Sequence, residues 1–208
     1  MRKHVLKLMM AALLMALVVP CVNAQVKVGD ILCEGDTLVR PADYDSLNLK
    51  AIGVVFYVDD SNEHGWAVAL EDVGSLAWGG YGDDTDLENF STRGSASRDV
   101  DGYNNTKTIR ENGKHHPAFH AVDFENGWYV PAMGQLKRLY KNLKEINPIL
   151  TQVGGSIIPR IGWNYWSSTE YSELNAWYLT TIGGAEHTSD GYNDNKAAPR
   201  IVRSVRDF

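Results

Sequence analysis

Acidic and amide side chains gather in three polar segments of the chain, and these are the residues best suited to hold a hard cation. The first segment covers residues 83–88, the second contains Asp99 and Asp101, and the third contains Asp190 and Asp194. Calcium takes about six to eight oxygen ligands, which such side chains supply. The motif Asp-Gly-Tyr-Asn occurs twice, but neither copy has EF-hand spacing. Solvated turns are the simpler interpretation, and a calcium site is the alternative.

Histidine and cysteine offer two other chemistries. His115, His116 and His120 suggest a metal site, but Pro117 interrupts the helix that would align the last two. A zinc site also needs a third ligand and an orienting second shell, and the sequence names neither. Cys33 is expected to be a small buried hydrophobe, because no base accompanies it in a recognisable pattern.

Motifs for catalysis are missing from the sequence. It contains no serine-hydrolase elbow, phosphate loop, dinucleotide fingerprint or zinc-peptidase motif. Carboxylates are plentiful, but no pair has a context that raises one pKa and leaves the other alone. We therefore expect a non-catalytic protein without a cofactor, and a polysaccharide hydrolase is the least favoured alternative.

Aromatic residues in the polar loops are candidate ligand contacts. The apolar C–H face of a sugar packs well on a ring that carries a polar edge. The loops at 74–114 and 183–199 would then form a variable binding face. The candidate stacking residues are Trp78, Tyr81, Tyr103, Trp163 and Tyr192.

The elements that would carry these loops indicate an α+β domain. Ala51–Val58 is a nearly continuous apolar run rich in β-branched and aromatic residues, which predicts a buried strand. A polar turn at 59–65 and a second strand over 66–71 complete a hairpin. Apolar residues at three- and four-residue steps predict one amphipathic helix over 133–147, ended by Pro148.

The remaining pattern consists of short strands separated by long loops. Residues 74–114 are rich in Gly, Asp, Asn, Ser and Thr, and predict one long structured loop. The further predicted strands are a pair within 26–38, then 128–131, 165–169, 176–182 and 201–206.

The first 24 residues are typical of an export signal. A basic start precedes the apolar run Leu8–Val19, and small or modest residues lead to a cleavage site after Ala24. The run is shorter than the roughly 20 residues that span a bilayer. A lipoprotein anchored through Cys21 is the competing reading, although Pro20 occupies a position where a lipobox has a small residue.

Cleavage would leave residues 25–208, with 25–49 as an extension packed on one domain over 50–208. The whole chain has 20 Lys and Arg against 26 Asp and Glu, and three of the basic residues lie in the signal. An acidic chain gains nothing from counterion release on nucleic acid, so we expect no such partner. No second apolar run reaches transmembrane length.

Three segments occur in an order that resembles known domains. They are Trp-Tyr-Val-Pro before the predicted helix, Trp-Ser-Ser-Thr-Glu before Ala-Trp-Tyr, and Val-Arg-Ser-Val-Arg at 202–206. This order resembles the Lcl C-terminal domain family and the Fibrobacter major paralogous domains, over most of residues 50–208. Those families are similar in fold to the formylglycine-generating-enzyme type of C-type-lectin-like domain.

The resemblance implies a C-type-lectin-like fold with short antiparallel strands, used at the cell surface for adhesion or binding, often to glycans. The calcium-binding triplets of sugar-binding C-type lectins and the reactive cysteines of the enzymes are missing here. We expect the motif residues to form the framework, with Glu170 pairing with an arginine. These residues are Trp128, Pro131, Trp166, Ser167, Ser168, Thr169, Glu170, Trp177, Arg203 and Arg206.

Two functions remain open from the sequence. The first is an exported, periplasmic or cell-surface binding domain whose partner is a glycan or a surface protein. The second is a structural component of a cell-surface assembly, which would use a strand edge or a flat apolar patch.

Overall fold

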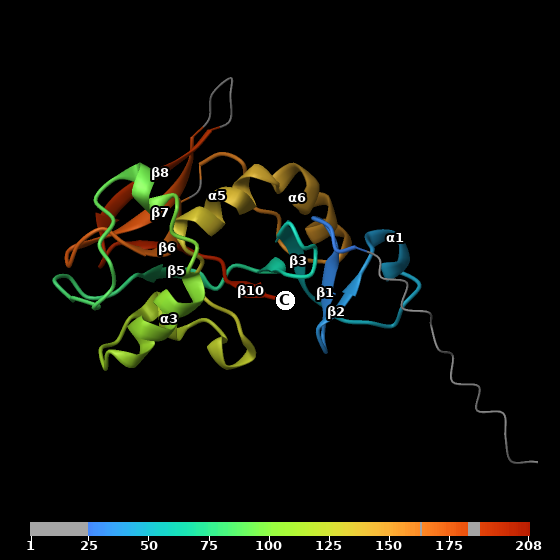
Figure 1. The fold of residues 1–208 in the computed structure, drawn as a ribbon, viewed down its shortest axis with the longest axis horizontal. Coiled ribbons are helices and arrows are strands. Elements are labelled where there is room, and N and C mark those ends of the chain that lie inside the picture. The colour runs from blue at the N-terminus through green and yellow to red at the C-terminus, as the bar shows by residue number, and fades with distance from the viewer. Residues whose placement is uncertain (1–24, 163, 183–187) are drawn as a thin grey trace, which may run out of the picture.

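Two five-stranded sheets organise the computed structural model, which describes residues 25–162, 164–182 and 188–208 (Figure 1). The first sheet has the order β10-β4-β3-β1-β2 and is antiparallel throughout. The second has the order β5-β9-β6-β7-β8, and only its β6–β9 pair is parallel among the described strands. The first sheet contains β1 (Ile31–Cys33), β2 (Thr37–Val39), β3 (Ala51–Val58), β4 (Gly65–Ala69) and β10 (Val205–Asp207). The second contains β5 (Gly74–Ala77), β6 (Asn164–Glu170), β7 (Asn175–Ile182), β8 (Thr188–Asn195) and β9 (Pro199–Val202).

Helices join the sheets and cover their faces. Helix α5 contacts both sheets, through β3 on one side and β6 and β7 on the other, while α6 packs on β3. Helix α3 packs on β6, and α4 packs on β5. The helices are α1 (Pro41–Tyr44), α2 (Arg93–Ala96), α3 (Gly102–Glu111), α4 (Pro117–His120), the 3-10 helix η1 (Phe124–Asn126), α5 (Met133–Lys141) and α6 (Leu143–Gln152). The α+β class expected from the sequence is therefore confirmed.

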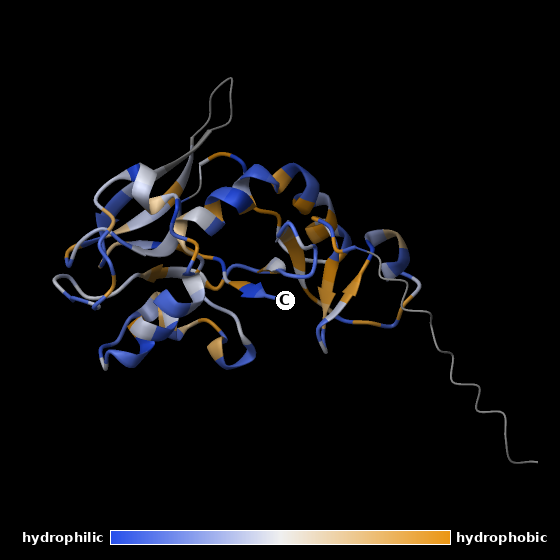
Figure 2. Cartoon of the chain, viewed as in Figure 1, coloured by the Kyte–Doolittle hydropathy of each residue, from blue (hydrophilic) through white to orange (hydrophobic). Residues whose placement is uncertain are grey.

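Side chains that point alternately to the two faces of β6 and β7 divide the interior into two hydrophobic cores. Tyr165 and Trp177 pack with α5, α6 and β3 in the larger core, while Trp166 and Ala176 pack with α3 and α4 in the smaller one. Successive side chains of a strand point to opposite faces, so each strand serves both cores. Figure 2 shows hydrophobic residues along β1, β2 and β3, the strands that pack against α6 and its flanks.

Residues 25–49, expected to be an extension packed on the domain, supply part of its first sheet. Strand β1 pairs with both β2 and β3, so residues 31–39 supply two strands of the first sheet. Strand β10 pairs with β4 at the opposite edge. No helix in the described part of the chain is long and apolar enough to cross a membrane. The predicted signal at 1–24, with Cys21, lies outside the described residues.

The single helix predicted over 133–147 is wrong, because the chain forms α5 and α6 with a break at Asn142. The Asn142 side-chain amide donates to the Phe56 carbonyl at 2.8 Å, which fixes the break against the first sheet. Pro148 lies inside α6 rather than ending a helix. A tertiary hydrogen bond thus decides where the helix stops, in place of the proline.

The loop predictions also need correction. Residues 74–114 include β5, α2 and the ten-residue α3, and residues 183–199 include all of β8. Residues 128–131 form an isolated bridge to β10 rather than a strand. Helix α3 has a weak apolar pattern, but Ile109 is fully buried and the Val130 N–H donates to the Thr106 hydroxyl at 3.1 Å. Packing against the rest of the domain therefore outweighs local propensity.

Candidate functional site

The Trp-Ser-Ser-Thr-Glu segment on β6 is buried and bonded to its surroundings. The Trp166 indole N–H donates to the Leu76 carbonyl at 3.0 Å, and the Ser167 hydroxyl donates to the Trp177 carbonyl at 2.7 Å. The Trp78 indole N–H donates to the Ser167 carbonyl at 2.7 Å. Trp78 has no exposed surface, so its predicted role as a stacking platform on the loop face is wrong.

The middle of the motif ties β6 to the start of α5. The Ser168 N–H donates to the Pro131 carbonyl at 2.8 Å. The Thr169 hydroxyl accepts from the Met133 N–H at 2.9 Å and donates to the Asp99 carboxylate at 2.7 Å. Hydroxyls that donate and accept at once satisfy backbone groups which burial would otherwise leave unpaired.

The carboxylates considered as calcium ligands are held by neighbouring amides. Asp99 accepts from the Asn105 amide at 3.0 Å, and Asp101 accepts from the Asn104 amide at 2.8 Å. Within the described residues no group of three or more His, Cys, Asp and Glu side chains is placed to hold a metal ion.

Glu170 ends the motif in a fully buried ion pair with Lys196, which was not foreseen. The Thr85 hydroxyl donates to Glu170 at 2.5 Å, and the Lys196 ammonium donates to the Asp83 carbonyl at 2.6 Å. The same ammonium lies 4.7 Å from the centre of the Trp78 ring. Burial raises the pKa of Glu170, and hydrogen bonds from Lys196 and Thr85 oppose that shift. This pair fastens the 78–90 loop to the second sheet.

The arginine partners expected for Glu170 lie elsewhere. Arg203 is buried and donates to the Leu70 carbonyl at 2.7 Å. Arg206 donates to the Asp36 carboxylate at 2.6 Å. Both side chains hold the C-terminal strand region against the N-terminal half of the chain.

The histidines form a packing cluster. His116 is fully buried, and its Nε2 lies 3.1 Å from the Asn112 amide nitrogen. Among the described residues its Nδ1 has no hydrogen-bond partner, and it packs against Gly79, where a Cβ would lie 2.2 Å away. Burial lowers the pKa of His116 to about 4, and the nearby Lys196 ammonium contributes to that decrease.

The aromatic residues of the polar loops differ in exposure. Tyr81 is 64% exposed, and Tyr103 is 40% exposed. The Tyr103 ring stacks on Phe124 with centroids 5.1 Å apart. Tyr192 is half-buried under the Arg93 guanidinium, which lies 4.5 Å from its ring centre. No interaction joins Tyr81, Tyr103 and Tyr192 to one another among the described contacts.

Two sequence candidates lie outside what the structure describes. These are Trp163 and the side chain of Asp190. Asp194 of the same polar segment forms an ion pair with Arg200. The thiol of Cys33 is buried, and this burial raises its pKa.

A different set of aromatic residues lines an open cleft at the end of the β3–β4 hairpin. The register shifts between Val55 and Tyr57, so Phe56 is the extra residue of a β-bulge. A bulge changes which face the following side chains occupy. Beyond it, Tyr57 pairs with Trp66, and their rings stack with centroids 4.4 Å apart and planes 26° apart.

Arg138 on α5 lies over this ring pair. Its guanidinium carbon is 5.0 Å from the Tyr57 ring centre and 5.2 Å from that of Trp66. These are cation–π distances, which hold the guanidinium in place without using its N–H donors. Arg138 makes no hydrogen bond or ion pair with the described residues, so those donors remain available.

The cleft has a volume of about 470 Å³. The Asp207 carboxylate accepts from the Tyr129 hydroxyl at 2.7 Å, and the Phe208 ring lies against Gly65. A hydrogen bond from the Ser61 hydroxyl lowers the pKa of Asp59, which keeps this carboxylate ionised. The residues that line the cleft are Tyr57, Asp59, His64, Gly65, Trp66, Val100, Arg138, Asp207 and Phe208.

The sequence pattern does not predict this cleft. Tyr57 and Trp66 were assigned to strands, and nothing in the spacing of residues 51–71 shows the bulge that aligns their rings. The available signal was the position of two large aromatics on either side of the polar 59–65 turn. Arg138 lies within residues 133–147, for which the sequence predicts only an amphipathic helix.

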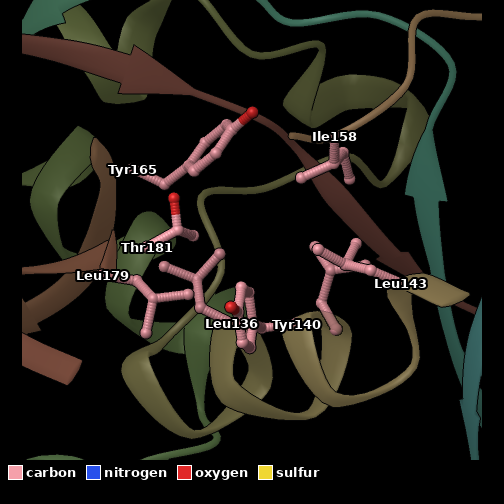
Figure 3. Close-up of a pocket in the computed structure, with 8 residues that line it drawn as sticks. Leu136, Tyr140, Leu143, Ile158, Tyr165, Leu179 and Thr181 are labelled. Atoms are coloured by element: carbon pink, nitrogen blue, oxygen red, sulfur yellow. The ribbon is translucent and has the colours of Figure 1, made fainter. Parts of the chain in front are cut away.

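Two other hollows fit a ligand less well. A cavity between α5, α6, β6 and β7 has a volume of about 10 Å³, the space of roughly one water molecule (Figure 3). A surface cleft of about 590 Å³ lies beside residues 27–30 and α6. Its Arg40 and Asp30 side chains already pair with each other at 2.9 Å.

The fold and cleft define an α+β, two-sheet protein with an open aromatic site. No protein-family model matches the chain, and no curated protein matches its sequence. Among solved structures it is similar to a fimbrial protein from Bacteroides ovatus ATCC 8483, with a TM-score of 0.67 and 18% identity. The match covers 88% of this chain and 49% of the fimbrial protein, so this chain spans about half that length. At this identity the similarity shows the fold alone.

Proposed function

We propose that the protein is an exported, non-catalytic binding or adhesion domain of the cell surface, in a C-type-lectin-like fold. The observation that carries this proposal is the similarity to a fimbrial protein over 88% of the chain. The export signal expected at 1–24 agrees with a surface location. The three motif segments carry the resemblance to C-type-lectin-like domains, and their burial supports a framework role.

The open cleft supports binding as the function. It combines an apolar platform with charged groups of both signs, which is typical of small-molecule sites. Asp59 is held ionised, so it does not suit the role of a general acid. The ligand in this proposal is a glycan or a surface protein.

A structural role in a surface assembly is the second candidate function. It is favoured by the same fimbrial similarity, together with the edge strands β2 and β8. Edge strands carry unpaired backbone groups that a neighbouring subunit can use. This role predicts oligomers of the chain, whereas the first predicts binding of a glycan or a surface protein.

The location is tested by antibody labelling of intact cells that make the full chain. We expect surface labelling, and loss of it when Leu13→Arg and Leu14→Arg break the apolar run of the signal. A Cys21→Ser variant that is released into the medium would show lipid anchoring. Antigen found only inside the cell would overturn the proposal.

Binding is tested on a glycan array with the full chain, with and without calcium, beside cross-linking of intact cells. Specific glycan signals support adhesion. A blank array with discrete cross-linked products supports assembly. If a correctly exported protein gives neither glycan signals nor cross-linked products, both functions are contradicted.

A further inference from the structure

We propose that the cleft formed by Tyr57, Trp66 and Arg138 binds one neutral sugar residue of a glycan. This inference rests on the proposed binding function and assigns it a place and a ligand chemistry. It moves the site away from the polar loops at 74–114 and 183–199, to the end of the β3–β4 hairpin.

The apolar part of the site is the stacked pair of rings. Tyr57 and Trp66 are both partly exposed, and each also contacts the larger core. Their positions are therefore fixed by the sheet before any ligand arrives. A preformed aromatic surface binds at a lower entropic cost than a mobile one. The C–H face of a pyranose ring fits such a surface.

The polar part of the site offers donors and acceptors together. The Arg138 guanidinium retains its N–H donors, and the Trp66 indole N–H makes no hydrogen bond with the described residues. Asp207 uses one carboxylate oxygen for Tyr129, and the other accepts nothing from the described residues. A sugar hydroxyl both donates and accepts, so a polyol can use both kinds of group.

The charges select against ionic ligands. Asp59 and Asp207 border the cleft and repel an acidic sugar, in a chain whose net charge is −6. Arg138 already occupies the cation–π position over both rings, which disfavours a protonated amine there. A neutral sugar meets neither penalty.

The wall of the cleft depends on a glycine. A Cβ at Gly65 would lie 2.1 Å from the Tyr57 carbonyl and 2.7 Å from the Phe208 ring. Glycine therefore lets Phe208 close one side of the cleft. The volume of about 470 Å³ accommodates a sugar residue with its hydration, within the range of about 300 to 1,000 Å³ found for ligand sites.

The test is a nitrogen-15 NMR titration of the full chain with three kinds of free probe. The probes are neutral methyl hexopyranosides and their oligomers, a uronic acid glycoside and a hexosamine. Trp66→Phe assigns the Trp66 indole signal. We expect the neutral probes to shift the Trp66 indole and Arg138 Nε signals, and to shift them more than the charged probes do.

Two matched variants locate the binding. Arg138→Gln should weaken binding of the strongest neutral probe about tenfold, because it removes charged donors. Arg93→Gln removes a guanidinium that lies over Tyr192 in the same manner, and it should leave the affinity unchanged. Melting temperatures of both variants check that each is folded.

Three results would overturn the inference. The first is that no neutral probe shifts the Trp66 indole signal, and the second is that a charged probe shifts it more than the neutral probes do. The third is that Arg93→Gln, rather than Arg138→Gln, weakens binding. Array binding that survives Arg138→Gln would reject the cleft while leaving the proposed binding function intact. A blank array and an unmoved Trp66 signal would reject both the cleft and glycan binding.

Discussion

At the scale of single residues, the Trp-Ser-Ser-Thr-Glu motif on β6 makes a set of buried polar contacts. Ser167, Thr169 and Glu170 have no significant exposed surface, and each bonds to a different part of the chain. Their residue types were visible in the sequence. Their partners were not, because Lys196 and Asp99 are distant along the chain and polar loops give no periodic signal.

The buried Glu170–Lys196 pair leads to a stability prediction. Lys196→Met should lower the free energy of unfolding by about 3 to 5 kcal/mol, because it leaves a buried carboxylate without its partner. Urea denaturation measures the change. Lys50→Met, which breaks the exposed pair with Glu34, is the control and should have no measurable effect. A small loss with Lys196→Met would mean that water reaches Glu170.

His116 leads to a pH prediction. Its pKa is about 4 in the folded protein against 6.5 for a free histidine, so the unfolded chain binds more protons between these values. Stability should therefore fall as pH drops from 6.5 toward 4. The loss is on the order of 1 kcal/mol or more, since one pKa unit corresponds to about 1.4 kcal/mol.

Urea denaturation at several pH values, with and without His116→Gln, isolates this contribution. The variant should show a smaller slope of stability against pH between 4 and 6.5. Exposed His64→Gln is the control and should keep the slope of the unaltered chain. An unchanged slope in the His116 variant would contradict the assignment.

At the scale of elements, strongly apolar segments were predictable and polar ones were not. The run Ala51–Val58 forms β3 as expected, because β-branched and aromatic residues fit a buried strand. Helix α3 and strand β8 consist mainly of polar residues, and neighbouring elements determine their conformation. The bulge at Phe56 was equally hidden, although it aligns the rings of the cleft.

Gly65→Ala tests the bulge and the cleft wall together. The added methyl group would collide with the Tyr57 carbonyl and the Phe208 ring, so we expect a loss of about 1 to 3 kcal/mol. Calorimetry measures the loss, and the NMR titration should show weaker sugar binding. A Cβ at Gly94 in α2 would meet no close neighbour, so Gly94→Ala is the control and should be neutral or slightly stabilising. Equal effects of the two changes would contradict the predicted collision.

At the scale of the whole molecule, α5 is the element that both sheets share. It packs on β3 and on β6 and β7, and Leu136 and Leu139 lie in the larger core. Removing either sheet would expose part of the α5 surface that the larger core buries. We therefore expect the two sheets to unfold as one cooperative unit.

Hydrogen exchange followed by mass spectrometry tests this expectation. Peptides from β3 and from β6 and β7 should exchange with the same free energy of opening, equal to that of global unfolding. Mild denaturant should lower both values in parallel. Exchange of one sheet at a clearly lower free energy would show separate folding units.

The pairing of β10 with β4 has a consequence for the order of events in the cell. Tyr57 and Trp66 are synthesised early, whereas Asp207 and Phe208 are made about 140 residues later. The cleft is therefore incomplete on every nascent chain that has not reached Phe208. A ligand that needs the whole cleft could therefore be bound only once β10 has been made and has paired with β4.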